Sequence, residues 1–329
     1  MIKVAVDAFG GDYAPEQIVE GALQAAEFDG IGVILTGNEA RLRSLINGKP
    51  GSDRIEIVHA PEVIQMDEAA EAVRTKTESS LVKAAQLVKE GHAGALVSAG
   101  STGATMATSV LTIRRIKGVE RPAITSLMPT RTGVALIVDV GANVDCKPSQ
   151  LVQFAQMGSI YAENVLRVHR PRVGLLNIGH EPSKGNCVVR EVYPLLREQD
   201  ASLNFIGNIE GRDISRGDCD VVVCDGFVGN VVLKFAEGLA DALFGMMKEE
   251  FTSSIPATLG ALLLKPGLRR IKKKVDYTEY GGAPLLGVNG MVIIAHGGSN
   301  AKAICNAIRV AKQGAQQNIV QGIAERMAT

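Results

Sequence analysis

One phrase recurs along this chain of 329 residues: a short β-branched run, then a loop rich in Gly, Asp or Asn, then an amphipathic helix. In chain order the strand-like runs are IKVAVD, GVILTG, GALVSAG, VALIVDV, VGLLNIG, DVVVCD and MVIIAH. Each run is almost continuously apolar, as expected for strands of a parallel sheet that is covered on both faces. The alternation of these strands with helices predicts an α/β fold, a three-layer αβα sandwich with a mostly parallel sheet.

The composition is that of a globular protein. Hydrophobic residues make up 46% of the chain, charged residues make up 21%, and basic and acidic residues are equal in number at 35 each. We expect a single unit over residues 1–329, and two interlocked α/β subdomains within it are the alternative organisation. The balanced charge gives no reason to expect nucleic acid as a partner. The N-terminal MIKVAVDAFGGD does not resemble a signal peptide, and no apolar run approaches the ~20 residues of a membrane span, so we expect a cytoplasmic protein.

The cysteines and histidines do not form a recognisable site. The five cysteines are odd in number and contain no CxxC, which favours free thiols: Cys146, Cys187, Cys219, Cys224 and Cys305. The histidines are not at metal-ligand spacing, so we expect no metal site. Cys146, in VDCKP, is a candidate nucleophile, although a small buried apolar side chain is the more common role for this residue type.

The loops that follow the strands carry the candidate site residues. Ligands of open parallel sheets bind outside the carboxyl ends of the strands, so we expect these loops to converge on one edge. For any one loop the alternative is structural, because glycine serves tight turns and Asp, Asn and Ser cap helices. Six polar loops at one edge favour a ligand site. These loops carry Asp7, Gly10, Gly11 and Asp12; Gly100, Ser101, Thr102 and Gly103; Asp139, Asn143 and Asp145; Asn177, Glu181 and Lys184; Asp225 and Asn230; and His296, Ser299 and Asn300.

Two of these loops suit an anion. The small residues of SAGSTGA, just before a predicted helix, let backbone N–H groups approach a phosphate. In NIGHEPSKGN, Lys184 stands between Ser183 and Gly185, where a lysine can hold an anion as a point charge, and a solvated loop lysine is the alternative. Neither GxxxxGK[ST] nor GxGxxG occurs after a strand, so a standard dinucleotide site is unsupported.

Longer sequence blocks resemble a known family. VDAFGGDYAPE, SAGSTGA, DVGANVDCKP, NIGHEPSKGN, NIEGRD, DGFVGNVVLK, EYGGAPLLGVNG and IAHGGSNAKAI follow one another from the N-terminus to the C-terminal region. In this order they resemble the bacterial phosphate acyltransferases of phospholipid synthesis, the PlsX family. One position departs from the family's pattern, because HGGSN stands at 296–300 where HGSSN is expected.

The resemblance implies a reaction and its participants. A long-chain acyl group would pass from acyl carrier protein to inorganic phosphate and give acyl phosphate for a membrane acyltransferase. The resemblance also implies a homodimer, no organic cofactor, and a fold similar to that of phosphotransacetylases and of the isocitrate and isopropylmalate dehydrogenases. Lys184 would hold the phosphate or neutralise the developing oxyanion. Asn143 and Asn230 would be hydrogen-bond donors.

Residues 255–275 contain an apolar and basic segment, which we expect to be a tip within the unit. Pro266 and Gly267 predict two short helical pieces that meet there. An apolar stripe bordered by cations is typical of a segment that lies on an anionic membrane, so we expect peripheral attachment to the inner face of the cell membrane. Docking of acyl carrier protein, and dimer or core packing, are the alternatives. The stripe is Leu259, Leu262, Leu263, Leu264 and Leu268, and the cations are Arg269, Arg270, Lys272, Lys273 and Lys274.

Two other functions compete with acyl transfer. An oxidoreductase of the isopropylmalate dehydrogenase type would need a metal-binding carboxylate cluster and a nicotinamide pocket, and neither can be assembled from the sequence. A non-catalytic membrane-associated scaffold would account for residues 259–274 but would leave the six polar loops without a purpose.

Overall fold

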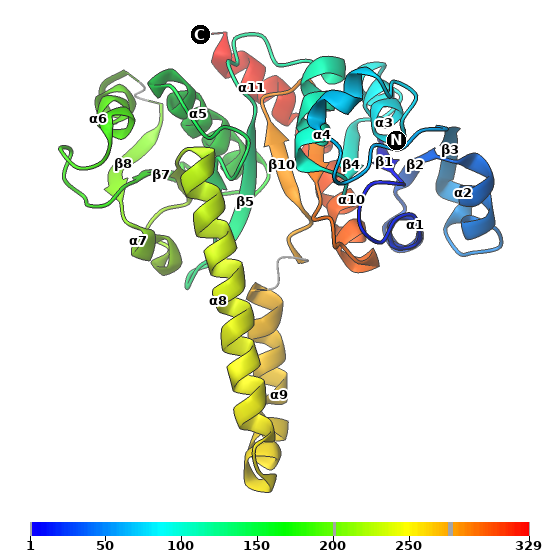
Figure 1. Ribbon diagram of the computed structural model, residues 1–329. Coiled ribbons are helices and arrows are strands. Elements are labelled where there is room, and N and C mark those ends of the chain that lie inside the picture. Colours follow the sequence, from blue (N-terminus) through cyan, green and yellow to red (C-terminus); the bar gives the residue numbers. More distant parts are fainter. Residues whose placement is uncertain (1, 200–201, 276–278, 329) are drawn as a thin grey trace.

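The computed structural model describes residues 2–199, 202–275 and 279–328, and an 11-stranded sheet forms its middle layer (Figure 1). The strands stand in the order β3-β2-β1-β4-β11-β10-β5-β6-β9-β7-β8. Their bounds are β1 (Lys3–Asp7), β2 (Gly32–Gly37), β3 (Ile55–His59), β4 (Ala95–Ser98), β5 (Ala123–Pro129), β6 (Val134–Val138), β7 (Arg172–Leu176), β8 (Asn204–Ile209), β9 (Val221–Val223), β10 (Ala283–Leu286) and β11 (Met291–Ile294).

Helices cover both faces of this sheet. Along β1, Val4 and Val6 enter the core beneath α1 and α10, and Ala5 enters the core on the opposite face beneath α3. The helices are α1 (Glu16–Asp29), α2 (Glu39–Ile46), α3 (Ser80–Lys89), α4 (Thr102–Thr108), α5 (Pro148–Asn164), α6 (Cys187–Pro194), α7 (Gly211–Arg216), α8 (Gly226–Thr252), α9 (Ile255–Val275), α10 (Ala301–Gln316) and α11 (Ile319–Met327). The prediction of a three-layer α/β fold is confirmed.

The sheet consists of two sets of parallel strands that run in opposite directions. Strands β3, β2, β1, β4 and β11 form one set, and β6, β9, β7 and β8 form the other. Strands β10 and β5 join them, because β10 is antiparallel to β11 and β5, and β5 is antiparallel to β6. Ile124 pairs with Leu285 of β10, and its neighbour Thr125 pairs with Val138, the last residue of β6. The carboxyl ends of both sets therefore meet along β5.

The strands agree with the prediction, but the edge of the sheet that the loops leave and the number of strands do not. All seven recurrent apolar runs form strands, and most pairings are parallel, as expected. The polar loops do not leave a single edge of the sheet, because the two sets point in opposite directions. The recurrent apolar runs do not include β3, β5, β8 and β10. These strands are partly exposed or contain proline, so they lack the continuous apolar signature of a doubly covered strand.

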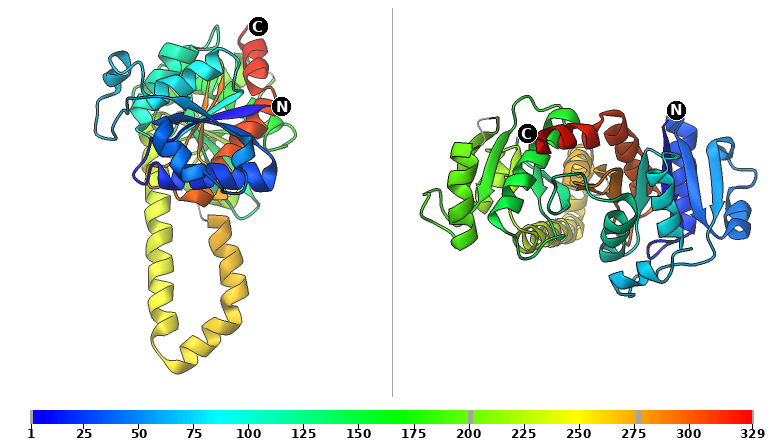
Figure 2. Two further views of the ribbon diagram at one scale, coloured as in Figure 1. Left: turned by 90° about the vertical axis from the view of Figure 1, so that its right-hand side faces the viewer. Right: turned by 90° about the horizontal axis from the view of Figure 1, so that it is seen from above.

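Helices α8 and α9 form a hairpin that projects from the body of the protein (Figures 1 and 2). The expected break at Pro266 and Gly267 is wrong, because α9 is one helix with Pro266 inside it, and the chain reverses direction between Thr252 and Ile255. Proline costs one backbone hydrogen bond but leaves the rest of a long helix intact, and α9 bends along its length in Figure 2. The leucines therefore lie close to the end of the hairpin, and the cations lie farther along α9.

Among the described residues, none of the helices combines the length and the apolar character required to cross a membrane.

The first turns of α8 pack directly on the end of β6, and this contact predicts a test of the fold. A Cβ at Gly229 would lie 1.9 Å from the carbonyl oxygen of Asp139, so Gly229→Ala should destabilise the protein by about 1–3 kcal/mol through overpacking. Gly238→Ala in the same helix is the matched control, because nothing lies within 4 Å of a Cβ there, and it should be neutral or stabilising. Urea unfolding midpoints compare the two variants, and equal midpoints would contradict the packing described.

Candidate active site

Loops from three strands of the first set contact one another. A Cβ on Gly10 would lie 2.8 Å from the amide nitrogen of Gly100, so the loops after β1 and β4 touch through their backbones. The amide of Asp12 donates a hydrogen bond to the carbonyl oxygen of Gly297, at 2.9 Å, which adds the loop after β11. Gly11 has a φ of +113°, a conformation that favours glycine. The close approach of these backbones explains why the loops are made of small residues.

A buried carboxylate lies behind these loops. Asp7 is 2% exposed, and its Oδ2 accepts a hydrogen bond from Oγ of Ser98 at 2.8 Å. The same Oγ accepts a hydrogen bond from the amide of Gly100, so the side chain of Asp7 is connected to the loop after β4. Burial raises the pKa of Asp7, and the hydrogen bonds from Ser80 and Ser98 oppose this effect.

Asp139 organises the corresponding loop of the second set. This fully buried residue follows β6 directly, and its Oδ1 accepts hydrogen bonds from the amides of Ile124, Gly141 and Ala142 at 3.0–3.2 Å. Its Oδ2 accepts hydrogen bonds from the backbone amide and the side-chain Nδ2 of Asn143, at 2.7 and 2.9 Å. Burial raises the pKa of Asp139, and the hydrogen bonds from Ala142, Asn143 and Ile124 to its carboxylate oppose the increase. The loop from Gly141 to Asn143 is thereby fixed.

The N-terminus of α8 is joined to this loop. The amide of Gly226 donates to the carbonyl oxygen of Asn143 at 2.7 Å, and Asp225 caps the helix by accepting from the amide of Val228 at 2.8 Å. In the next turn, the side chain of Asn230 lies beside Gly141. No hydrogen bond holds the Asn230 amide to any residue in the part of the chain that the structure describes.

A cavity of 350 Å³ lies where the loops of the two sets meet, and we refer to it as the central cavity. Thr102 and His296 reach it from the first set, Gly141 reaches it from the second, and Asn230 reaches it from α8. A ligand in the central cavity would therefore contact both halves of the sheet, as expected for a site at the point where strand direction reverses.

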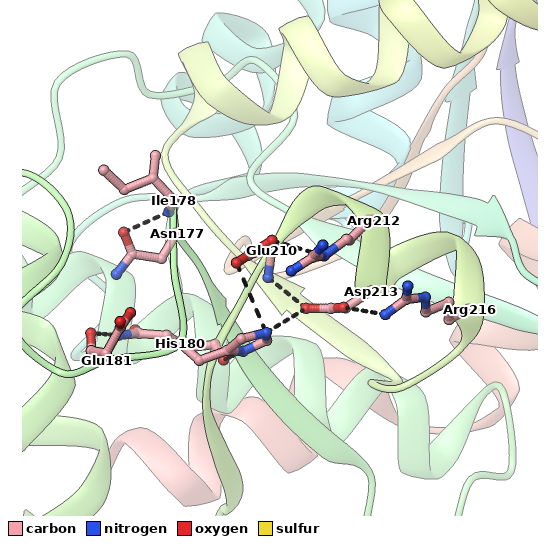
Figure 3. Close-up of polar contacts among 9 residues, drawn as sticks. Asn177, Ile178, His180, Glu181, Glu210, Arg212, Asp213 and Arg216 are labelled. Carbon is pink, nitrogen blue, oxygen red and sulfur yellow. Dashed lines mark hydrogen bonds and ion pairs between the residues drawn. The ribbon is translucent and has the colours of Figure 1, made fainter.

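The loop that carries Lys184 adjoins this region but does not line the central cavity. Its ends are held together because Nδ2 of Asn177 donates to the carbonyl oxygen of Lys184 at 3.0 Å. His180 holds the loop to the next strand and to α7, since its Nδ1 lies 3.1 Å from the carbonyl oxygen of Asn208 and its Nε2 lies 3.5 Å from Asp213 (Figure 3).

Lys184 itself is exposed, and no carboxylate among the described residues forms an ion pair with its ammonium group. The loop after β7 thus presents an unpaired cation beside the β9–α8 segment, because β7 and β9 are neighbours in the sheet.

Comparisons with known proteins agree with this architecture. The model of the fatty acid synthesis protein family matches residues 2–322. The phosphate acyltransferase of Desulfitobacterium hafniense is 56% identical over 99% of this chain and 98% of its own length, and that of Pelotomaculum thermopropionicum is 54% identical over 98% and 94%. This chain belongs to the PlsX family of phosphate acyltransferases. It is an enzyme that transfers acyl groups to phosphate.

Solved structures show a similar fold at low sequence identity. A phosphotransacetylase from Streptococcus pyogenes has a TM-score of 0.66 and 19% identity, and covers 96% of this chain and 94% of its own. A 4-hydroxythreonine-4-phosphate dehydrogenase from Klebsiella pneumoniae has a TM-score of 0.57 and 13% identity, over 96% and 100%. The expected likeness to phosphotransacetylase and dehydrogenase folds is confirmed at the level of fold.

In this acyltransferase the structure places the predicted site residues in three groups. Thr102, Asn230 and His296 line the central cavity, and the glycine loops around Gly10, Gly11, Gly100 and Gly103 lie against the same cluster of loops or enter α4. A second group has capping or loop-closing roles: Asp225 and Asn300 cap helices, and Asn177 closes the lysine loop. A third group, Asp145, Glu181 and Lys184, is exposed and outside the cavity lining.

Asn143 has a different geometry from the one expected of a donor. Its Nδ2 donates to the carbonyl oxygen of Pro122 at 2.8 Å as well as to Asp139, so both of its side-chain N–H groups are engaged. We therefore assign it to positioning of the loop, and Asn230 keeps its free amide. Ser101 uses its carbonyl oxygen to accept from Thr105, and Asp12 contributes its backbone to the contact with Gly297.

Two residues that organise these loops stand among the polar loop residues expected from the sequence, but their role was not predicted. Asp7 and Asp139 are the carboxylates that hold the two loop clusters, and each stands directly after an apolar strand, in IKVAVD and VALIVDV. An acidic residue that follows a buried strand was the available signal. Among the described residues, no group of three or more His, Cys, Asp or Glu is arranged to hold a metal ion.

Cys146 is placed where it would be a poor nucleophile. Burial, and then the neighbouring Asp139 and Asp225, raise the pKa of its thiol to about 12, and its Sγ lies 3.4 Å from the carbonyl oxygen of Asn143. At neutral pH the residue is therefore a thiol rather than a thiolate, which is the nucleophilic form.

Cys146→Ala should consequently retain most of the acyltransferase activity. At pH 8, iodoacetamide should label Cys146 much more slowly than the exposed Cys187, which serves as the internal control. Loss of activity in Cys146→Ala together with trapping of an acylated Cys146 by mass spectrometry would refute this assignment.

Proposed function

We propose that the enzyme takes a long-chain acyl group from the thioester of acyl carrier protein and transfers it to inorganic phosphate, giving acyl phosphate and the free carrier. Membership of the phosphate acyltransferase family supports phosphate as the acceptor. The observation that carries the proposal is the central cavity, where glycine loops and the free amide of Asn230 meet in a cleft with no activated thiol. Such a site suits direct attack by phosphate, which is already a nucleophile at neutral pH.

In this mechanism the protein binds, orients and stabilises charge. The thioester carbonyl lies at the polar opening of the central cavity, within reach of the Asn230 amide and the backbone N–H groups near Thr102. As phosphate attacks, negative charge develops on the carbonyl oxygen, and these donors stabilise it. Lys184 pairs with phosphate, and its flexible stem lets the ammonium group reach from the neighbouring loop. Collapse of the intermediate expels the carrier thiolate.

Lys184→Ala tests the proposed role of the cation. Turnover of an acyl-carrier thioester with phosphate should fall at least about a hundredfold, since loss of one preorganised charge-stabilising group costs ~2.7–4 kcal/mol. Mass spectrometry of acyl phosphate measures the product. Lys117→Ala is the matched control, because Lys117 is also an exposed loop lysine followed by a glycine of positive φ.

The variants must fold for this comparison to count, and the urea unfolding midpoint checks that they do. Near-normal turnover of Lys184→Ala would remove this residue from the mechanism. Absence of acyl phosphate with the unaltered protein would overturn the proposed reaction itself.

We also propose that the enzyme is a homodimer. One exposed apolar stripe follows α8 with a spacing of three or four residues from Phe227 to Met246, or ~30 Å of helix. Its members are Phe227, Val231, Phe235, Leu239, Leu243 and Met246, of which Phe235 is 69% exposed. A stripe of this length is unusual on the surface of a monomer, and a second copy of the same hairpin offers a matching surface.

The end of the hairpin is proposed to contact an anionic membrane. Leu259, Leu262, Leu263 and Leu264 are all exposed near the reversal between α8 and α9, and Leu263 is 85% exposed. Burial of one leucine is worth roughly 1.5–3 kcal/mol, and each cation near an anionic leaflet adds about 1 kcal/mol. Leu268, Arg269, Arg270, Lys273 and Lys274 follow along the same helix, as does Lys272, whose side chain lies outside the described part. Reversible binding would keep a reactive lipid product close to a membrane acyltransferase.

Replacement of Leu262, Leu263 and Leu264 by Glu should release the protein from vesicles that contain anionic lipid and leave turnover in solution largely unchanged. Vesicle flotation and the acyl phosphate assay measure the two effects. Survival of vesicle binding with loss of carrier-dependent turnover would make the hairpin a carrier dock or a structural element instead.

A further inference from the structure

The central cavity has a polar opening and an apolar floor. Ile124, Val140 and Ile294 form the deepest wall, and each is between 4% and 6% exposed. Leu127 of β5 and Leu233 of α8 complete the sides. Thr102, Asn230 and His296, the polar lining residues named above, are exposed and therefore lie at the opening.

The backbone at the floor offers few free hydrogen-bonding groups. The amide of Ile124 already donates to Oδ1 of Asp139, and its carbonyl oxygen accepts from the amide of Val140. Thr125 next to it directs its hydroxyl to the carbonyl oxygen of Pro284. At the floor, the amides or hydroxyls of a polar ligand would lose their hydrogen bonds to water and find no partner in the protein. An alkyl chain has no such groups and would not incur this cost.

The geometry points to the central cavity as the binding site of the donor's acyl chain. This inference rests on the proposed function and adds to it the position of the chain. The carbonyl carbon stays at the opening beside Asn230, and the methylene groups enter between Leu127, Leu233 and the floor. The cavity then extends along α8 from Asn230 to Glu237, seven residues or ~10 Å, toward Tyr280 at the base of the hairpin.

The size of the cavity limits how much of the chain it can hold. At ~30 Å³ per group, the volume of a water molecule in the liquid, 350 Å³ accommodates at most about twelve methylene-sized groups, and the ~10 Å length along α8 holds about eight bonds of an extended chain. Each methylene that is buried contributes up to about a fourfold gain in kcat/KM, and a methylene beyond the cavity contributes little. The far end carries the exposed ion pair of Lys234 and Glu237, at 2.8 Å, so a longer chain emerges into solvent there.

A series of acyl-carrier thioesters with 4 to 18 carbons provides the first test. The value of kcat/KM should rise with chain length and level off between about eight and twelve carbons. In Leu233→Trp the larger side chain occupies part of the cavity, so kcat/KM for the longest chains should fall at least about tenfold and should level off at a shorter chain than in the unaltered protein. Leu111→Trp is the control, because Leu111 is exposed outside the cavity lining, and its profile should match that of the unaltered protein.

Binding without turnover provides the second test. The chain contains no tryptophan, so Tyr280→Trp places a single fluorophore at the far end of the cavity. Its emission should shift with dodecyl phosphate, whose chain reaches it, and not with butyl phosphate or inorganic phosphate. The single tryptophan of Leu111→Trp should respond to none of the three.

The outcomes separate this inference from the proposed reaction. Acyl phosphate production that is independent of chain length, or unchanged by Leu233→Trp, would overturn the acyl site and leave the reaction standing. An equal response of Tyr280→Trp to butyl and dodecyl phosphate would also overturn it. Failure of the unaltered protein to form acyl phosphate from any donor would instead overturn the reaction. The dependence of Tyr280→Trp emission on alkyl chain length would then still test whether the central cavity binds an alkyl chain.

Discussion

The antiparallel pairing of β5 with β10 on one side and with β6 on the other is the constraint on which the site depends. Without this reversal, the loops after β1, β4 and β11 and those after β6, β7 and β9 would emerge at one common edge of a long sheet. Because the sets run in opposite directions and meet along β5, loops that are far apart in strand order surround one cavity. Residues at the ends of strands from both sets, together with one face of α8, therefore line the central cavity.

The two loop clusters are each held by one buried carboxylate. Asp139 accepts five hydrogen bonds from N–H groups, and Asp7 acts through Ser98 on the loop after β4. Burial of these groups raises the pKa of both, so each depends on its hydrogen bonds for stability in the folded protein. Because Asp7 and Asp139 hold the loops, the backbone amides near the cavity have fixed directions before any ligand binds. Fixed donors are the condition for effective stabilisation of developing charge.

The parts of this structure that the sequence predicts are those with a local signal. Continuous apolar runs predict seven strands, and small residues after them predict the turns, because burial on both faces and close backbone approach each require a particular residue type. Strands β5 and β10 give no such signal: AITSLMP contains polar residues and proline, APLL is short and contains proline, and both pair in a way that depends on distant segments. The reversal of strand direction could not be predicted for this reason. The role of Asn143 also depends on a distant group, the carbonyl oxygen of Pro122, which no spacing along the chain indicates.

The distance between the central cavity and the end of the hairpin decides how a product can reach a membrane. From Glu237, at the far end of the cavity, to Thr252, the last residue of α8, the helix rises over 15 residues, or ~22 Å. An extended chain advances ~1.2 Å per bond, one third of the ~3.5 Å of an extended residue, so about eighteen bonds are needed to cover this distance. An acyl chain with its first eight to twelve carbons, about the number that the cavity holds, has too few carbons left. On the proposed placement, then, acyl phosphate leaves the cavity before its chain enters the bilayer. The hairpin would thus serve to hold the enzyme near the membrane rather than to insert the product, which accords with the expectation that loss of its leucines spares turnover in solution.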